Sequence, residues 1–181
     1  MTLRPLFAAF AAVALAAPAA ANLPVGATAP VFATQGAKAG KPFAINLRAA
    51  LRKGPVVLYF YPKAFTQGCT LEAKAFADAS PQFAAAGATV VGMSADDLPT
   101  LQKFSTEACR DKFAVAIATP AIIKAYNVDL QREGVSTGLT TRTSYVIGQD
   151  GKVRFVHSNM DYKDHVRLTL EAVQALRKTK R

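Results

Sequence analysis

The sequence predicts an α/β fold with a central mixed β-sheet flanked by helices. Val56–Tyr61 is an uncharged run of β-branched and aromatic residues, which is typical of a central strand covered on both faces. Strand-like runs then alternate with helical patterns, and a hairpin pattern precedes a last amphipathic helix. This alternation predicts a sheet with helices on both faces.

The other elements follow from turn residues and hydrophobic periodicity. Gly148-Gln-Asp-Gly151 supplies an Asp-Gly turn between two strands. The expected strands are Ala88–Ser94, Phe113–Ala118, Thr143–Ile147 and Val153–His157. Helices are expected from about Cys69, from Asp96-Asp97 to about Lys112, over Ala121–Tyr126 and over Asp164–Lys178. The strand-like pieces Ala29–Phe32 and Pro42–Leu47 predict an N-terminal β-hairpin extension, and polar Asn127–Thr141 predicts a surface loop.

Residues 1–21 have the pattern of a cleaved signal peptide. Arg4 supplies the positive charge, Leu6–Ala17 the apolar stretch and Ala19–Ala21 the small residues of a cleavage site. The alternative is a membrane anchor, but the apolar stretch is short and Pro18 interrupts it. We therefore expect a single domain, residues 22–181, that is exported and periplasmic.

The chain is strongly basic, with a formal net charge of +10 and a basic cluster at Arg177–Arg181. Such an excess can indicate a nucleic acid or an anionic membrane as a partner. Here the basic residues are not interleaved with aromatic ones, and an exported protein meets little nucleic acid. A solvated surface is therefore favoured, and we expect no nucleic-acid partner and no stable membrane insertion.

Cys69 is the candidate reactive group. Pro62 ends the preceding strand because it has no N–H to donate, and a helix then begins at about Cys69 with Glu72 expected in its first turn. Unpaired N–H groups and the helix dipole favour a thiolate there, and the Thr66 hydroxyl can turn back toward the sulfur. A nearby arginine would contribute more than the dipole. The alternative, a small buried hydrophobic cysteine, is disfavoured because a loop rich in Pro, Thr and Gly is a poor place to bury one.

The spacing Pro62-x-x-x-Thr66-x-x-Cys69 resembles the active-site motif of peroxiredoxins. The strings Leu58-Tyr-Phe-Tyr-Pro-Lys63 and Gly68-Cys-Thr-x-Glu72-Ala are similar to the Q-type, or bacterioferritin-comigratory-protein, branch of that family. The resemblance extends from about residue 23 to the last helix. It implies a thioredoxin-like fold and a thiol-dependent peroxidase for hydrogen peroxide and organic hydroperoxides, without a cofactor.

The resemblance also implies roles for particular residues. By itself Arg142 is only a charge at the start of a strand, where most such residues are solvated. Its likeness to the family's arginine implies that it lies beside the sulfur and stabilises both the thiolate and the oxygen that develops negative charge. Thr66 would hydrogen-bond the peroxide and the sulfur, and Pro62 would shield the sulfur from water. Cys69 would become a sulfenic acid.

The second thiol departs from the most familiar pattern. Many Q-type members carry a resolving cysteine five residues after the first, where this chain has Lys74. Some resolve from a later helix, which makes Cys109 the candidate for an intramolecular disulfide in an atypical two-Cys enzyme. The alternatives are a buried structural Cys109 and a one-Cys enzyme resolved by an external thiol. The resemblance further implies recycling by a thioredoxin-like dithiol reductant and a monomer or weak dimer.

Other classes fit the residues less well. A thiol–disulfide oxidoreductase on the same fold would need Cys-x-x-Cys, which Cys69-Thr-Leu-Glu72 lacks. A copper-delivery protein would need a second cysteine and a suitably placed histidine. A non-enzymatic domain with a structural disulfide stays open as an alternative. His157 and His165 lie on different expected elements without metal-ligand spacing, so we expect ordinary surface or helix-start histidines and no metal site.

Overall fold

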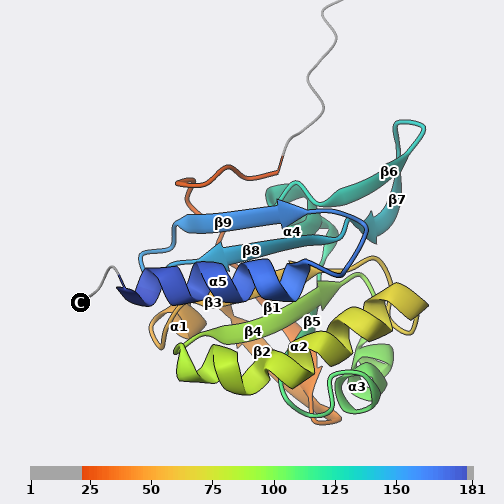
Figure 1. Cartoon of the computed structure of the whole chain (residues 1–181). Helices are drawn as coiled ribbons and strands as arrows, with labels where there is room; N and C mark the ends of the chain where they lie inside the picture. The colour runs from red at the N-terminus through yellow and green to blue at the C-terminus, as the bar shows by residue number, and fades with distance from the viewer. Residues whose placement is uncertain (1–21, 179–181) are drawn as a thin grey trace, which may run out of the picture.

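Strand β3 (Val56–Phe60) lies inside the sheet with every residue buried, as its uncharged sequence predicts. In the computed structural model, which describes residues 22–178, it belongs to a seven-stranded sheet of order β2-β1-β5-β4-β3-β8-β9 (Figure 1). The other strands are β1 (Ala33–Lys38), β2 (Lys41–Asn46), β4 (Thr89–Ser94), β5 (Ala114–Ile117), β6 (Asp129–Arg132), β7 (Val135–Thr140), β8 (Thr143–Ile147) and β9 (Val153–Ser158). The helices are α1 (Leu47–Leu51), α2 (Gln67–Ala85), α3 (Leu98–Glu107), α4 (Pro120–Ala125) and α5 (His165–Lys178).

The sheet is mixed, as predicted. Strands β3, β4 and β5 run parallel, whereas β8 pairs antiparallel with β3 and β9, and β1 pairs antiparallel with β5 and β2. Successive side chains of a strand point to opposite faces. Thus Val57 and Tyr59 pack with α2, α3 and α5 on one face, while Leu58 packs with α1 and α4 on the other (Figure 1). The predicted α/β fold class with helices on both faces is confirmed.

The N-terminal hairpin exists, but its first strand was expected too early. It spans β1 and β2 rather than beginning at Ala29–Phe32, and it joins the main sheet through β5. Gly36 permits this contact, because a Cβ there would lie 2.1 Å from the carbonyl oxygen of Val115. Gly36 is therefore a point of close backbone approach inside a strand.

Three further expectations need correction. The segment 127–141 is a β6–β7 hairpin that extends from the body of the molecule, and not a loop; its exposed faces remove the hydrophobic alternation that would have predicted strands (Figure 1). Helix α3 ends at Glu107, short of Lys112, because Arg110 and Asp111 take positive φ angles of 50° and 61°. Helix α1 was not predicted at all; its N-cap is the side chain of Asn46.

The predicted signal peptide lies outside the described residues, as does the end of the basic C-terminal cluster, residues 179–181. Between residues 22 and 178, every helix is too short or too polar to cross a lipid bilayer.

Candidate active site

Cys69 is the third residue of α2, just after the loop that follows β3. The helix begins two residues earlier than its pattern predicts, with Thr66 as the N-cap residue. The N–H groups of a first helical turn have no partner within the helix, and they lie at the positive end of the helix dipole. The Cys69 side chain is 1% exposed, so this field acts on a sulfur that is largely shielded from water.

The loop between β3 and α2 is tied to neighbouring strands. The carboxylate of Asp96 accepts hydrogen bonds from the backbone N–H of Ala64 and the hydroxyl of Ser94, each at 2.8 Å. The hydroxyl of Thr140 donates to the carbonyl oxygen of Tyr61 at 2.7 Å. Asp96, which the sequence suggested only as charge at a helix start, therefore fixes the loop that delivers Cys69.

Arg142 reaches the sulfur from the residue before β8. Its Nη2 lies 3.4 Å from Sγ of Cys69, and its Nε donates to the carbonyl oxygen of Met160 at 2.9 Å. Its Nη1 forms an ion pair with the carboxylate of Glu72. Burial would lower the pKa of Arg142, but the negative charges of Glu72 and Cys69 raise it, so the guanidinium stays charged.

Glu72 is the main site residue that the sequence did not identify. It was expected in the first turn of the helix, where an acid suits the dipole, but it lies one turn after Cys69 and is 0% exposed. Burial raises its pKa to about 7, against the opposing effect of Arg142. Its Oε1 atom is buried without a hydrogen-bond partner. The spacing Cys69-x-x-Glu72, which places both side chains on one helix face, was the available signal.

Gly68 makes room for the arginine. A Cβ at this position would lie 3.2 Å from Nη2 of Arg142, closer than most side-chain contacts. Its lack of a side chain lets the guanidinium lie against the first turn of α2.

A buried histidine lies behind the ion pair. His165 begins α5, in agreement with the expectation of a surface or helix-start histidine, but it is 0% exposed and so is not a surface residue. Its Nδ1 is 2.8 Å from Oγ of Ser144 and 3.7 Å from Oε1 of Glu72. The His157 ring lies edge-on to it at 4.5 Å between centroids. Within residues 22–178, no cluster of three or more His, Cys, Asp or Glu side chains is placed to hold a metal ion.

Thr66, which also lies in this loop, has its hydroxyl placed differently from expectation. The Thr66 hydroxyl donates to the carbonyl oxygen of Lys63 at 2.9 Å, so its single proton is directed away from the sulfur in this structure. Pro62 is half-buried, two residues beyond the end of β3.

Cys109 lies in the turn after α3 rather than in the helix, and it is fully buried. Both cysteines are free thiols. Burial raises the pKa of the Cys109 thiol, which disfavours its thiolate in this conformation.

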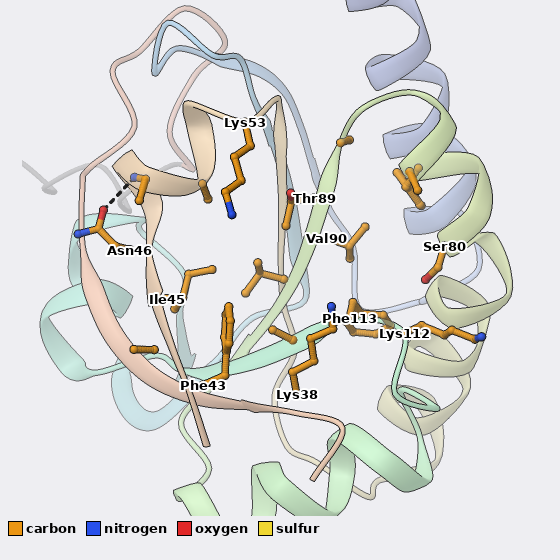
Figure 2. Close-up of a pocket in the computed structure, with 18 residues that line it drawn as sticks. Lys38, Phe43, Ile45, Asn46, Lys53, Ser80, Thr89, Val90, Lys112 and Phe113 are labelled. Carbon is orange, nitrogen blue, oxygen red and sulfur yellow. Dashed lines mark hydrogen bonds between the residues drawn. The ribbon is translucent and has the colours of Figure 1, made fainter. Parts of the chain in front are cut away.

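A hollow of about 490 Å³ lies away from this site, between the β1–β2 hairpin, α1 and the second half of α2 (Figure 2). Its wall includes Phe43, Ile45 and Phe113, and Lys53 extends toward its centre (Figure 2). Cys69 does not line it. The thiol site is therefore a buried contact of a few side chains, separate from this hollow.

Comparison with known proteins identifies the class to which this fold and site belong. The AhpC/TSA family matches residues 25–156, and the chain is a member of that family, the peroxiredoxins. Its relatives include Q-type members. A putative peroxiredoxin of Mycobacterium tuberculosis is 36% identical over 72% of this chain and 86% of its own length. Chloroplastic peroxiredoxin Q of Suaeda salsa is 34% identical over 72% of this chain and 61% of its own length.

Solved structures agree with this assignment. Peroxidoxin BcpB from Mycobacterium tuberculosis is 31% identical, with a TM-score of 0.74 over 84% of this chain and 97% of that protein. Peroxiredoxin Q of Xanthomonas campestris is 25% identical, with a TM-score of 0.69 over 79% and 90% of the two chains. The matched region covers only 55% of the rice peroxiredoxin Q and 61% of the Suaeda relative.

Proposed function

We propose that this chain is a thiol-dependent peroxidase in which Cys69 reduces hydrogen peroxide and organic hydroperoxides. The observation that carries the proposal is the 3.4 Å contact between Nη2 of Arg142 and Sγ of Cys69, both shielded from water. A fixed guanidinium at this distance stabilises a thiolate and supplies N–H donors for a second anion beside it.

The Cys69 thiolate attacks one oxygen of the peroxide, forming an S–O bond as the O–O bond breaks. The electron pair of that bond leaves on the second oxygen, which takes a proton and departs as water or an alcohol. Cys69 is thereby oxidised to a sulfenic acid, and the peroxide is reduced. Arg142 stabilises the charge that develops on the departing oxygen, which is an electrostatic contribution of the oxyanion-hole type. Alkyl peroxide reduction is the activity ascribed to a structural neighbour, the bacterioferritin comigratory protein of Xanthomonas campestris, and it supports organic hydroperoxides as substrates.

Thr66 and Pro62 act at the entrance in this proposal. Rotation of the Thr66 hydroxyl away from Lys63 would let it donate to the bound peroxide, and the Pro62 ring would limit access of water to the sulfur. Both side chains lie in the loop that Asp96 and Thr140 tie to the sheet.

Resolution of the sulfenic acid is assigned to Cys109. Its thiol would condense with the sulfenic acid to give a Cys69–Cys109 disulfide and water, and a thioredoxin-like dithiol would reduce that disulfide by exchange. Direct bridging needs Cα atoms within about 7 Å. Because Cys109 is fully buried and its pKa is raised, the step requires a local rearrangement of the α3 turn or the start of α2. The one-Cys alternative, with an external thiol in this role, shares the same first step.

Peroxide titration with mass-mapped cysteine states tests this function. The wild type is expected to consume one equivalent of hydrogen peroxide rapidly and to form a Cys69–Cys109 bridge. Cys69→Ser should lose the reaction, whereas Cys109→Ser should complete one turnover and stop as sulfenic acid. Equally slow consumption by all three proteins would overturn the peroxidase and favour a non-enzymatic domain. A rapid wild-type reaction that leaves only intermolecular or over-oxidised Cys69 would favour the one-Cys alternative.

We also propose that the chain is exported, with cleavage after Ala21 leaving residues 22–181 as a monomer or weak dimer. The support is the charge, apolar run and small residues of the first 21 positions. Periplasmic fractions should contain a protein whose first residue is Asn22, and recovery of the uncleaved chain from the cytoplasm would contradict the proposal.

A further inference from the structure

His165 holds its ring in one orientation through two hydrogen bonds. Its Nε2 lies 2.9 Å from the carbonyl oxygen of Asn159, and its Nδ1 lies 2.8 Å from Oγ of Ser144. A carbonyl oxygen only accepts, so Nε2 carries the hydrogen and Nδ1 accepts from the Ser144 hydroxyl. These partners assign the neutral Nε2–H tautomer.

The groups around the ring keep it neutral. Burial, together with the charges of His157 and Arg142, lowers the pKa of His165 to about 4, against the opposing effects of the hydrogen bond to Asn159 and the charge of Asp161. His157 faces it from β9, Ser144 from β8 and Glu72 from α2. The imidazole is therefore a fixed hydrogen-bonding group at neutral pH and not a second cation that would compete with Arg142.

The backbone of Asn159 and Met160, to which His165 is hydrogen-bonded, also forms hydrogen bonds with Arg142. Asn159 donates its backbone N–H to the carbonyl oxygen of Arg142 at 3.2 Å. The next residue, Met160, accepts from Nε of Arg142 at 2.9 Å. The hydrogen bond from His165 to the Asn159 carbonyl fixes the peptide plane that joins these two residues.

We propose that His165 is a positioning residue for peroxide reduction, because its Nε2–H holds the Asn159–Met160 backbone that orients the Arg142 guanidinium toward Cys69. The inference rests on the proposed peroxidase function. Two of the three guanidinium nitrogens contact Cys69 and Glu72, so the bond from Nε to Met160 sets the direction of the fork. If that backbone were free to move, the guanidinium of Arg142 could rotate. Its N–H groups would then stabilise the bound peroxide less well, whereas its charge would still stabilise the Cys69 thiolate.

Two substitutions separate the hydrogen bond from the presence of the ring. In His165→Gln the longer amide can place an N–H near the position of Nε2 and keep the bond to Asn159. In His165→Asn the shorter amide reaches only the position of Nδ1 and loses that bond. His157→Asn is the matched control, because it removes the neighbouring ring without touching residues 159–160 or Arg142. Far-UV circular dichroism and thermal unfolding establish that each variant is folded.

The test compares two rates for the same sulfur: single-turnover oxidation of Cys69 by hydrogen peroxide, and its alkylation by iodoacetamide, which needs a thiolate but no peroxide activation. His165→Asn should lose about 10- to 100-fold in the peroxide rate, as expected for a misplaced catalytic group. Its alkylation rate should stay close to that of the wild type. His165→Gln and His157→Asn should keep both rates near the wild-type values.

Three results would overturn the inference: a wild-type peroxide rate in His165→Asn, an equal loss of both rates, or a loss in His165→Gln as large as in His165→Asn. If His165→Asn does not fold, Ser144→Ala decides. It removes one of the two hydrogen bonds that hold the imidazole ring, so it should lower the peroxide rate selectively, by a smaller factor than expected for His165→Asn; an unchanged rate would refute the inference. A wild-type protein that fails to react with peroxide would instead refute the proposed function itself.

Discussion

In this site the guanidinium of Arg142 interacts with two side chains that can carry negative charge, those of Cys69 and Glu72. Arg142 contacts the sulfur of Cys69 and the carboxylate of Glu72, and all three groups are buried. With Glu72 ionised, its charge offsets part of the attraction that Arg142 exerts on the thiolate. Because the pKa of Glu72 is about 7, the balance between these two anions changes within the physiological range of pH.

The position of Gly68 gives a prediction that separates activity from stability. A methyl group there would lie 3.2 Å from Nη2 of Arg142 and would displace the guanidinium by a few tenths of an ångström. Gly68→Ala should therefore slow the reaction of Cys69 with hydrogen peroxide by about tenfold, in line with the sensitivity of catalysis to small misplacements. The same change should stabilise the helix by about 0.4–1 kcal/mol, because alanine restricts the unfolded chain.

Stopped-flow kinetics and chemical denaturation measure the two effects. Lys74→Ala, an exposed change on the same helix, is the control and should alter neither strongly. A Gly68→Ala protein with an unchanged peroxide rate would show that the added methyl group does not displace the guanidinium of Arg142.

Sequence patterns identified some of these residues and missed others for a physical reason. Cys69 could be predicted because its loop and helix are local features, and Arg142 because it matches a family motif. The ion pair between Glu72 and Arg142 joins residues far apart in the chain, so no local pattern reports it. His165 reads as a polar residue at a helix start, and only the packing of α5 on β8 and β9 buries it.

At the scale of secondary-structure elements, the N-terminal hairpin depends on one close approach. Strand β1 pairs with β5 at Gly36, where a Cβ would lie 2.1 Å from the carbonyl oxygen of Val115 and 2.6 Å from Cα of Ala116. These are backbone atoms, which cannot move aside without separating the strands. Gly36→Ala should therefore lower the free energy of unfolding by about 3 kcal/mol, the upper range for overpacking.

Urea denaturation of Gly36→Ala and of Gln35→Ala, an exposed neighbour in the same strand, tests this expectation. Comparable stability of the two variants would mean that β1 tolerates displacement from β5. The same strand shows what a pattern cannot supply, because a glycine that punctuates a loop and a glycine that admits a neighbouring backbone look identical in sequence.

The β6–β7 hairpin and the end of α3 also show where sequence patterns fail to predict secondary structure. Both strands of the hairpin are largely exposed, so neither needs the apolar alternation by which strands are recognised. The buried residues Ala108 and Cys109 continue the apolar pattern of α3 although the helix has already ended at Glu107. Cys109 consequently lies in a turn, which is easier to rearrange than the middle of a helix.

At the scale of the whole molecule, Glu72 and His165 make opposing contributions to the pH dependence of stability. The folded pKa of Glu72 is raised from 4.5 to about 7, so its contribution is present below pH 4.5 and is lost as the pH rises to 7. The folded pKa of His165 is lowered from 6.5 to about 4, so its contribution is present above pH 6.5 and is lost as the pH falls to 4. Between these limits the two effects largely cancel.

Substitution of Glu72 or His165 should expose the pH dependence of stability that comes from the remaining residue. Relative to the wild type, Glu72→Gln should gain up to about 3 kcal/mol in free energy of unfolding as the pH rises from 4.5 to 7. His165→Gln should show the opposite sign: its free energy of unfolding should fall relative to that of the wild type as the pH rises from 4 to 6.5. Guanidinium denaturation at a series of pH values measures both differences. Two variants that follow the wild-type profile in parallel would contradict the raised and lowered pKa values.

The overall architecture was the part most open to prediction. Uncharged β3, the Asp-Gly turn between β8 and β9 and the amphipathic pattern of α5 each report burial directly, and together they define a mixed sheet with helices on both faces. The site could not be predicted from such local patterns alone, because it depends on side chains that three separate elements bring within hydrogen-bonding distance.

The most direct test of the account is the rate at which hydrogen peroxide oxidises Cys69 when Arg142 is changed. Arg142→Ala should lower the second-order rate constant about 10²- to 10³-fold, as for loss of a donor to a developing oxyanion. Arg142→Lys should recover only part of this loss, since an ammonium keeps the charge but not the planar fork. Wild-type rates in a folded Arg142→Ala protein would show that the guanidinium beside the sulfur has no part in the chemistry.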